Sequence, residues 1–211
     1  MQRTLPSLPS SAMPICLAIG GIVVALSVAG CRPAIDDGIK FSDDLQSQSQ
    51  PIDDFSQLSF IGPDGQPIKL VGQMQHKYAV LVVTRGWTGA ICLYCASQTS
   101  KWARRFDELE PFDAELFVVF PTETAGDAKL VEELQKKITT GPVENDSIPF
   151  PILLDIDLKS VDQLGIRDEL AKPATYIIDQ QGRVRFAYVG QSIADRPSVD
   201  AILKQLSRMT D

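Results

Sequence analysis

The pattern of apolar and polar positions divides the chain into three parts. Residues 1–30 hold one charged residue and a long apolar run. Residues 31–55 are rich in Asp, Ser and Gln and show no apolar periodicity, which predicts a flexible tether. From residue 56 to residue 211, short apolar runs alternate with stretches of helical spacing, and we expect this part to fold as one domain.

Within that domain, the patterns predict an alternation of strands and helices. Apolar runs and turn signals predict strands and hairpins over residues 58–70, 78–84, 116–120, 149–155 and 174–189. Apolar positions three and four apart predict helices after residue 92, around 130–138, around 158–164 and after Pro197. The order predicts an α/β fold, with a central mixed β-sheet flanked by helices on both faces.

The apolar run near the start of the chain predicts export. It follows a single basic residue, Arg3, and ends in small residues, as a signal peptide does. The run is short for a stable transmembrane helix, which needs about 20 residues. Its end, Val28-Ala29-Gly30-Cys31, resembles a bacterial lipobox, in which the cysteine becomes the lipidated first residue of the mature protein. We therefore expect a lipoprotein signal peptide over 1–30 and an acylated Cys31. The lipid would hold the domain at a bacterial membrane outside the cytoplasm, in the periplasm; the alternative is an uncleaved anchor.

Charge and the cysteine count narrow the chemistry. The formal net charge of −7 argues against a nucleic-acid partner and offers no basic patch to anionic lipid. Of the four cysteines, Cys16 lies in the predicted signal peptide and Cys31 would carry lipid, which leaves Cys92 and Cys95 for chemistry. His76 is the only histidine, so the chain lacks a third and fourth ligand for a closed zinc site unless it dimerises. We expect no metal and no cofactor.

Cys92 and Cys95 follow the strand predicted over 78–84 and begin a predicted helix. The spacing lets their sulfurs meet across one helical turn, and the start of a helix favours a thiolate at Cys92. Cys95 is expected to point inward, because it shares the apolar face of the predicted helix with Thr99, Trp102, Phe106 and Leu109. A Cys-x-x-Cys beside a strand–helix–strand pattern predicts a redox pair. Half of a zinc site and two buried structural cysteines are the alternatives.

Three segments stand in a distinctive order. They are Arg85-Gly86-Trp87 with the cysteine pair, Phe150-Pro151-Ile152-Leu153-Leu154-Asp155 with Gly165-Ile166, and the run from Lys172-Pro173-Ala174-Thr175 to Arg185. Together they resemble the thioredoxin-fold redoxins, in particular their alkyl-hydroperoxide-reductase/thiol-specific-antioxidant (peroxiredoxin-like) branch. The resemblance spans about residues 56–209 and implies a thioredoxin-like fold.

The resemblance also implies roles for residues around the pair. Pro173 would be a cis proline facing the cysteines, and Lys172 before it would offer its backbone N–H and C=O to an extended substrate chain. Arg185 aligns with the arginine that peroxiredoxins use to polarise peroxide and stabilise the thiolate; a solvent-facing strand arginine is the alternative. Peroxiredoxins carry a threonine three residues before the peroxidatic cysteine, and relative to Cys95 that place holds Cys92.

We therefore expect a membrane-tethered thiol–disulfide oxidoreductase, acting on protein thiols or disulfides. Cys92 would attack a substrate disulfide and Cys95 would resolve the mixed disulfide. The first alternative is a peroxiredoxin-like thiol peroxidase that reduces hydroperoxides. The second is a non-enzymatic domain whose redox state controls partner binding. The spacing of the pair favours the oxidoreductase, and Arg185 favours the peroxidase.

Overall fold

The computed structural model describes residues 38–139 and 148–210. The predicted signal peptide, Cys31 and the first part of the predicted tether lie outside these residues. Within the described ranges, no helix is both long enough and apolar enough to cross a membrane.

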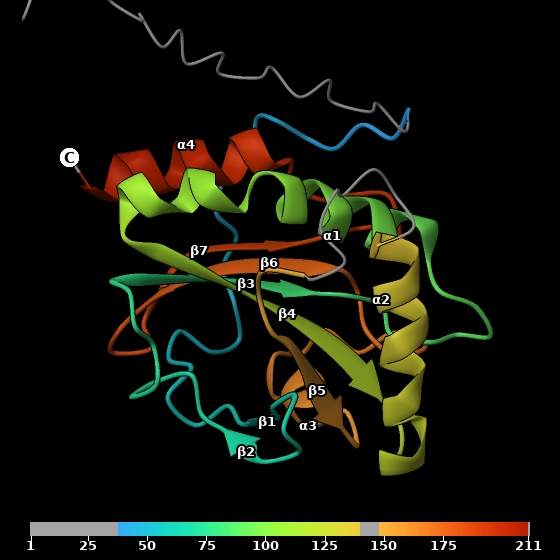
Figure 1. Ribbon diagram of the computed structural model, residues 1–211. Helices are drawn as coiled ribbons and strands as arrows, with labels where there is room; N and C mark the ends of the chain where they lie inside the picture. The colour runs from blue at the N-terminus through green and yellow to red at the C-terminus, as the bar shows by residue number, and fades with distance from the viewer. Residues whose placement is uncertain (1–37, 140–147, 211) are drawn as a thin grey trace, which may run out of the picture. The chain divides into compact units, whose positions relative to one another are not determined.

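A seven-stranded mixed sheet, of order β2-β1-β5-β4-β3-β6-β7, forms the centre of the domain (Figure 1). Its strands are β1 (Phe60–Ile61), β2 (Pro67–Ile68), β3 (Tyr78–Val83), β4 (Ala114–Thr122), β5 (Ile152–Ile156), β6 (Ala174–Asp179) and β7 (Val184–Val189). The three central strands β3, β4 and β5 run parallel, whereas β6, β7 and the β1–β2 hairpin are antiparallel to their neighbours. The structure confirms the predicted α/β class and the mixed sheet.

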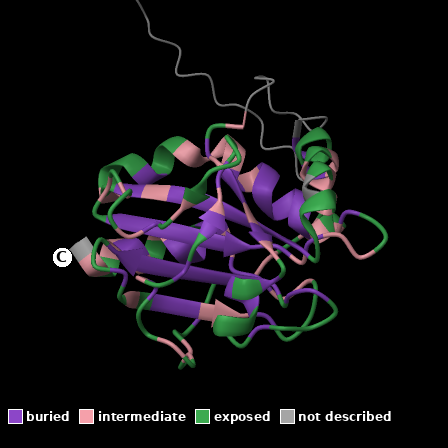
Figure 2. Ribbon diagram, turned by 90° about the horizontal axis from the view of Figure 1, so that it is seen from below, coloured by how far each residue is buried: buried purple, intermediate pink, exposed green. Residues whose placement is uncertain are grey.

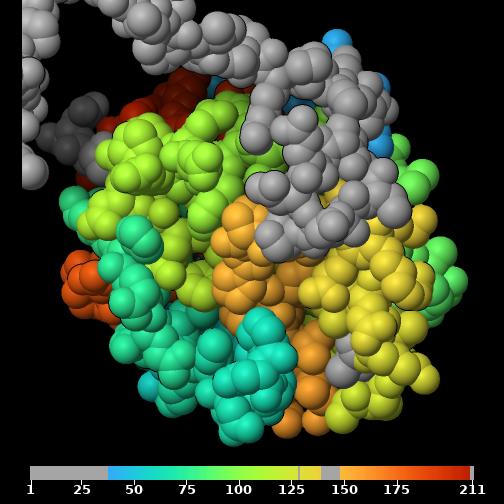
Figure 3. Space-filling view, viewed as in Figure 1, coloured from blue at the N-terminus to red at the C-terminus, as the bar shows by residue number. Residues whose placement is uncertain are grey.

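Helices and 3₁₀ turns connect the strands. They are α1 (Leu93–Arg104), η1 (Phe106–Phe112), η2 (Ala125–Leu130), α2 (Val131–Thr139), α3 (Lys159–Gln163) and α4 (Val199–Thr210). Figure 1 shows α1 and α4 together on one face of the sheet and α3 on the other. On the side shown in Figure 3, the β1–β2 hairpin and α2 flank the segment that contains β5. The helix predicted after the cysteines ends at Arg104 and continues as η1, which contains Pro111. Phe106 and Leu109 therefore lie in η1 and not on the predicted helix, and Phe106 is only half-buried. Proline removes a backbone donor and clashes with the preceding turn, so an α-helix does not extend through it.

Two apolar clusters fill the two faces of the sheet. Val80 and Val82 of β3 belong to the cluster that contains Trp102 of α1 and Leu206 of α4. The alternate β3 residues Ala79, Leu81 and Val83 belong to the second cluster, with Phe55, Leu58 and Leu158. Every residue of β3 is therefore buried, as Figure 2 shows for the central strands, and the all-apolar run predicted this.

Residues 38–55 are part of the fold, which corrects the prediction of a flexible tether for this segment. The Gln48 N–H donates to the Ala187 carbonyl at 2.8 Å, and the Val189 N–H donates to Gln48 Oε1 at 2.8 Å. Phe55 is fully buried. The polar composition misled the prediction because β7 is an edge strand whose open backbone groups need partners, and glutamine and serine side chains supply them.

Replacing Phe55 with alanine should lower the free energy of unfolding by about 3–5 kcal/mol, the usual effect of emptying a fully buried phenylalanine site. Its ring contacts Tyr176 with centroids 4.9 Å apart, edge to face. Urea titration of the detergent-solubilised full-length protein would measure the change. Phe41→Ala is the matched control: Phe41 is half-buried in the same segment and should lose much less. A loss of under about 1 kcal/mol for Phe55→Ala, the ordinary surface range, would restore the tether interpretation.

Candidate active site

The cysteine pair lies at the first turn of α1, beyond the carboxyl end of β3. Cys92 is the N-cap residue, with extended backbone angles φ −61° and ψ 124°, and Cys95 lies within the first turn. Both are free thiols. Cys92 is half-buried, whereas Cys95 is only 2% exposed. The structure thus confirms that Cys92 is at the helix tip and that Cys95 points inward.

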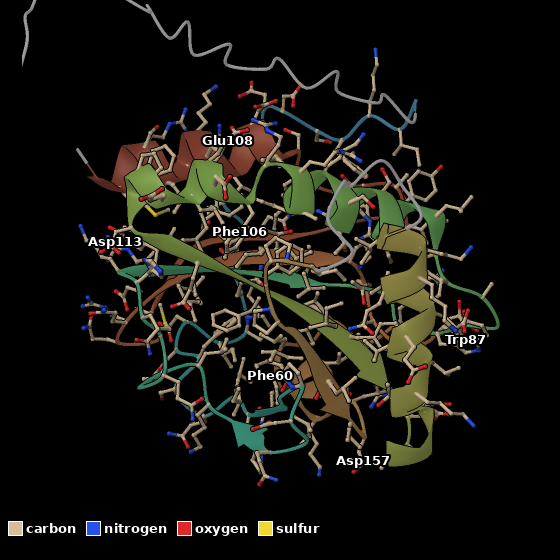
Figure 4. The ribbon with its side chains drawn as sticks, viewed as in Figure 1. Phe60, Trp87, Phe106, Glu108, Asp113 and Asp157 are labelled. Carbon is tan, nitrogen blue, oxygen red and sulfur yellow. The ribbon has the colours of Figure 1, made fainter. Side chains whose placement is uncertain are left out.

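The turn between β3 and α1 depends on glycine at position 86. Gly86 has a φ of +77°, and a Cβ there would collide with the Pro121 carbonyl oxygen and the Leu170 side chain. Trp87, which Figure 4 shows in this loop, pairs with Ile91 in an isolated bridge just before the cysteines. The close turn brings the Arg85 N–H to 3.4 Å from the Cys95 sulfur. The backbone therefore supplies one hydrogen bond to this sulfur.

A buried arginine that sequence analysis did not identify supplies a further contact with the Cys95 sulfur. Arg196, 1% exposed, lies in the loop between β7 and α4, and its Nη2 is 3.1 Å from the Cys95 sulfur. Its Nη1 donates to Gln98 Oε1 at 2.8 Å, and its Nε donates to the Ile193 carbonyl at 2.9 Å. The local sequence does not indicate that Arg196 is buried beside a cysteine, because an arginine before a helix-opening proline is typical of a surface turn. A full positive charge is thus held against the redox pair.

The two thiols ionise as a coupled pair. A hydrogen bond from Cys95, with N–H groups of the helix start and the charge of Arg196, lowers the pKa of Cys92 to about 5, although burial opposes this. The same hydrogen bond, together with burial, raises the pKa of Cys95 well above its usual value, and Arg196 only partly offsets this. Although Arg196 contacts Cys95, we assign the first ionisation to Cys92, because the Cys95 proton can be donated toward it. At neutral pH the pair then carries a single negative charge.

The structure places Lys172 and Pro173 at the same edge of the sheet as the cysteines. Ala174, which follows them, pairs with Val83 at the end of β3. Pro173 is buried, Lys172 is exposed, and the Pro173 carbonyl accepts from the Gly190 N–H at 2.8 Å. The Lys172 N–H donates to the Ile166 carbonyl at 2.8 Å. This corrects the expectation that it is offered to a substrate chain, because the loop itself uses that donor. The cis state of Pro173 stays a prediction.

Arg185 lies away from the pair, which corrects the role that the resemblance implied. Its Nη1 is 3.8 Å from Asp179 Oδ2, and its side chain is 45% exposed. Asp179 pairs with Tyr78 at the start of β3, the opposite end of the strand from the cysteines. The register of β6 and β7 shifts at this point, so Ile178 faces Val184 while Ile177 faces Phe186. Arg185 is the extra residue of this bulge and therefore has no register partner in β6.

The residues around the cysteine pair do not support a zinc site. In residues 38–139 and 148–210, no group of three or more His, Cys, Asp or Glu side chains is placed to hold a metal ion. His76 instead lies 2.9 Å from Asp113 Oδ1, just before the start of β3. The exposure and lowered pKa of Cys92 also argue against two inert structural cysteines.

A sequence comparison identifies the family of the chain. The model of the AhpC/TSA family matches residues 49–187. The chain belongs to the AhpC/TSA family. The match includes both cysteines and the Lys172–Pro173 loop, and with this site it makes the protein a thiol-dependent redox enzyme. Arg196 lies beyond the matched residues. No curated protein matches the chain in sequence.

Solved peroxiredoxins share the fold at low sequence identity. A yeast mitochondrial 1-Cys peroxiredoxin is 16% identical, with a TM-score of 0.61, over 79% of this chain and 77% of its own. A mutant of peroxiredoxin 6 of Arenicola marina is 14% identical, with a TM-score of 0.60, over 74% and 71%. Peroxidoxin BcpB of Mycobacterium tuberculosis is 16% identical, with a TM-score of 0.53, over 78% and 96%. These likenesses show that the fold is the thioredoxin-like fold of the peroxiredoxins.

Alkylation of Cys92 in the reduced protein should show a midpoint near pH 5. The thiolate is the form that reacts with iodoacetamide, and the lowered pKa keeps it populated until the pH falls through about 5. Alkylation rates over the acidic to mildly alkaline range, with the modified residue located by mass spectrometry, would measure this. Cys95→Ala, which removes the donor to Cys92, should move the midpoint upward. A wild-type midpoint near the ordinary thiol value of about 8.5 would contradict the assignment.

Proposed function

We propose that this protein is a thiol–disulfide oxidoreductase in which Cys92 and Cys95 alternate between a dithiol and an internal disulfide. The observation that carries the proposal is the pairing of an accessible, readily ionised sulfur with a buried thiol one helical turn away. The first sulfur can reach a substrate, and the second can reach only the first. This division of labour is what a two-step exchange requires.

The exchange follows from the two environments. The Cys92 thiolate attacks one sulfur of a substrate disulfide, a Cys92–substrate bond forms, and the other substrate sulfur leaves as a thiolate. Cys95 then attacks the Cys92 sulfur and releases the second substrate thiol, so that two electrons pass from the pair to the substrate. The same two steps in reverse oxidise a substrate dithiol and reduce the pair. Once Cys92 is bonded to substrate, it no longer accepts the Cys95 hydrogen bond or carries a charge, and these are two of the causes that raise the pKa of Cys95. Arg196, 3.1 Å away, then favours the Cys95 thiolate for the second step.

The surface beside the pair supports a polypeptide substrate. In the described part of the chain, the large apolar side chains that are exposed are Leu93, at 66%, and Ile193, at 41%. Leu93 directly follows Cys92. The Ile193 carbonyl accepts a hydrogen bond from Arg196, which contacts Cys95. Exposed apolar residues in the two segments that hold the cysteine pair and Arg196 suit a protein partner better than a small polar one.

A second candidate function is a thiol peroxidase, favoured by the guanidinium of Arg196 beside the pair and by the family. The Cys92 thiolate would attack a hydroperoxide, which gives a sulfenic acid on Cys92 and releases an alcohol. Cys95 would condense with the sulfenic acid, forming the disulfide and releasing water. The solved structures of similar fold are named as peroxiredoxins, which supports keeping this reaction as an alternative. The oxidoreductase comes first because Cys92 stands where peroxiredoxins carry the threonine relative to Cys95.

We also propose that the domain is tethered to a bacterial membrane through lipid on Cys31, on the periplasmic side. The support is the sequence alone: an apolar run that ends in Val28-Ala29-Gly30-Cys31. Acyl chains contribute roughly 0.8 kcal/mol per buried methylene, so a multiply acylated cysteine would hold firmly.

A trapping experiment tests the order of attack. Cys95→Ser in the full-length protein should accumulate mixed disulfides through Cys92, because no second thiol resolves them. Cys92→Ser should trap little, since Cys95 is buried. Non-reducing gels followed by mass spectrometry of the adducts would show both results. If Cys92→Ser traps instead, and also consumes hydroperoxide, then Cys95 is the peroxidatic cysteine. A thiol peroxidase with the roles of the two sulfurs exchanged is then the better account.

Mass spectrometry of the membrane fraction should find an acylated Cys31 at the N-terminus of the mature protein. Cys31→Ser should remain unprocessed, because the lipobox processing reaction requires the cysteine. A variant that is still cleaved and still membrane-bound would refute the lipobox prediction.

A further inference from the structure

We infer that Arg196 makes the cysteine pair an oxidant, so that its preferred substrates are dithiols rather than disulfides. This inference rests on the proposed function and adds the direction of electron flow, which that function leaves open. It starts from an unusual feature, a buried guanidinium whose contacts include a sulfur and no carboxylate.

Among the groups that contact Arg196 in the described residues, only a cysteine sulfur can carry a negative charge. The Arg196 guanidinium contacts the Gln98 side-chain oxygen, the Ile193 carbonyl and the Cys95 sulfur. None of the ion pairs found among the described residues includes Arg196. The adjacent carboxylate, Asp195, accepts instead from the Tyr188 hydroxyl at 2.6 Å and from the Gln191 N–H at 2.8 Å. A buried cation without an opposite charge is strongly unfavourable, whereas the Cys92 thiolate, whose pKa the charge of Arg196 helps to lower, would balance it.

Oxidation removes that balance. In the dithiol state the pair carries one negative charge beside Arg196, and in the disulfide state both sulfurs are neutral. The guanidinium cannot lose its proton to compensate. Arg196 therefore stabilises the reduced state relative to the oxidised state. A pair whose reduced form is selectively stabilised has a raised reduction potential and accepts electrons readily.

The resulting reaction is the oxidation of a substrate dithiol. One substrate thiolate attacks the Cys92 sulfur of the internal disulfide, and Cys95 leaves as a thiolate toward Arg196. The second substrate thiolate attacks the sulfur now bonded to Cys92, which releases a substrate disulfide and reduces Cys92. Two electrons pass to the pair, which keeps one of the two substrate protons while the other goes to solvent. A hydroperoxide would reoxidise the pair by the sulfenic-acid route described above, giving an alcohol and water.

The test is equilibration of the full-length protein with glutathione buffers of defined ratio, with the dithiol fraction measured by alkylation. Arg196→Met should favour the internal disulfide at least about tenfold relative to wild type, which is about 30 mV for a two-electron couple. Arg196→Lys, which keeps the charge, should lie between the two. Arg183→Met is the control. The exposed Arg183 side chain pairs with Asp179 away from the cysteines, and its replacement should leave the equilibrium unchanged.

Thermal unfolding of the wild-type protein provides a second readout that needs no variant to fold. The reduced form should unfold at a higher temperature than the oxidised form. An oxidised form that is the more stable, or an Arg196→Met equilibrium equal to that of wild type, would overturn the inference. Neither measurement involves a substrate, whereas the trapping experiment does. Failure to trap a substrate would therefore refute the proposed function. The role of Arg196 in the reduction potential would still be tested by the glutathione equilibrium and by thermal unfolding.

Discussion

The hydrogen bonding of β3 to β4 on one side and to β6 on the other is the constraint on which the site depends. It places one fully buried strand at the centre of two apolar clusters, so the end of β3 has little freedom to move. The Arg85 N–H that reaches Cys95 and the β6 residues that follow Pro173 are both fixed by this strand. The cysteine pair is therefore held by the interior of the domain, even though one of its sulfurs is reachable from solvent.

Much of this arrangement could be predicted from the sequence because it is local. The apolar run of β3 and the two-residue cysteine spacing are each complete within a short window, and they predicted a central strand and an inward-facing Cys95. The packing of residues 38–55 could not be predicted in this way. A glutamine-rich segment reads as disordered until a specific edge strand offers backbone groups to its amides, as β7 does to Gln48.

The residue that places a positive charge beside the cysteines was also beyond prediction from the sequence. Resemblance pointed to Arg185, one residue of a strand pattern, but a bulge in β7 turns that residue toward Asp179. Arg196 takes its place from a loop 101 positions after Cys95 in the chain. Nothing near Arg196 in the sequence signals a buried guanidinium, since its contacts are made only after α1 and the loop before α4 have packed together. The chemistry that the site needs was thus foreseeable, whereas the residue that supplies it was not.

The way in which residues 38–55 cover β7 also restricts how a partner can bind. Many domains capture extended peptides by adding a strand to an open sheet edge, a mode called β-augmentation. Here one edge is occupied, since Ala187 and Val189 already bond to Gln48, and the other edge strand, β2, is two residues long. The polypeptide substrate that we propose would therefore be left with side-chain recognition near the start of α1 and the loop before α4. Such recognition would depend on contacts with a few apolar side chains around a thiol and not on hydrogen bonds to an extended backbone. It would suit an enzyme that accepts partners of unrelated sequence.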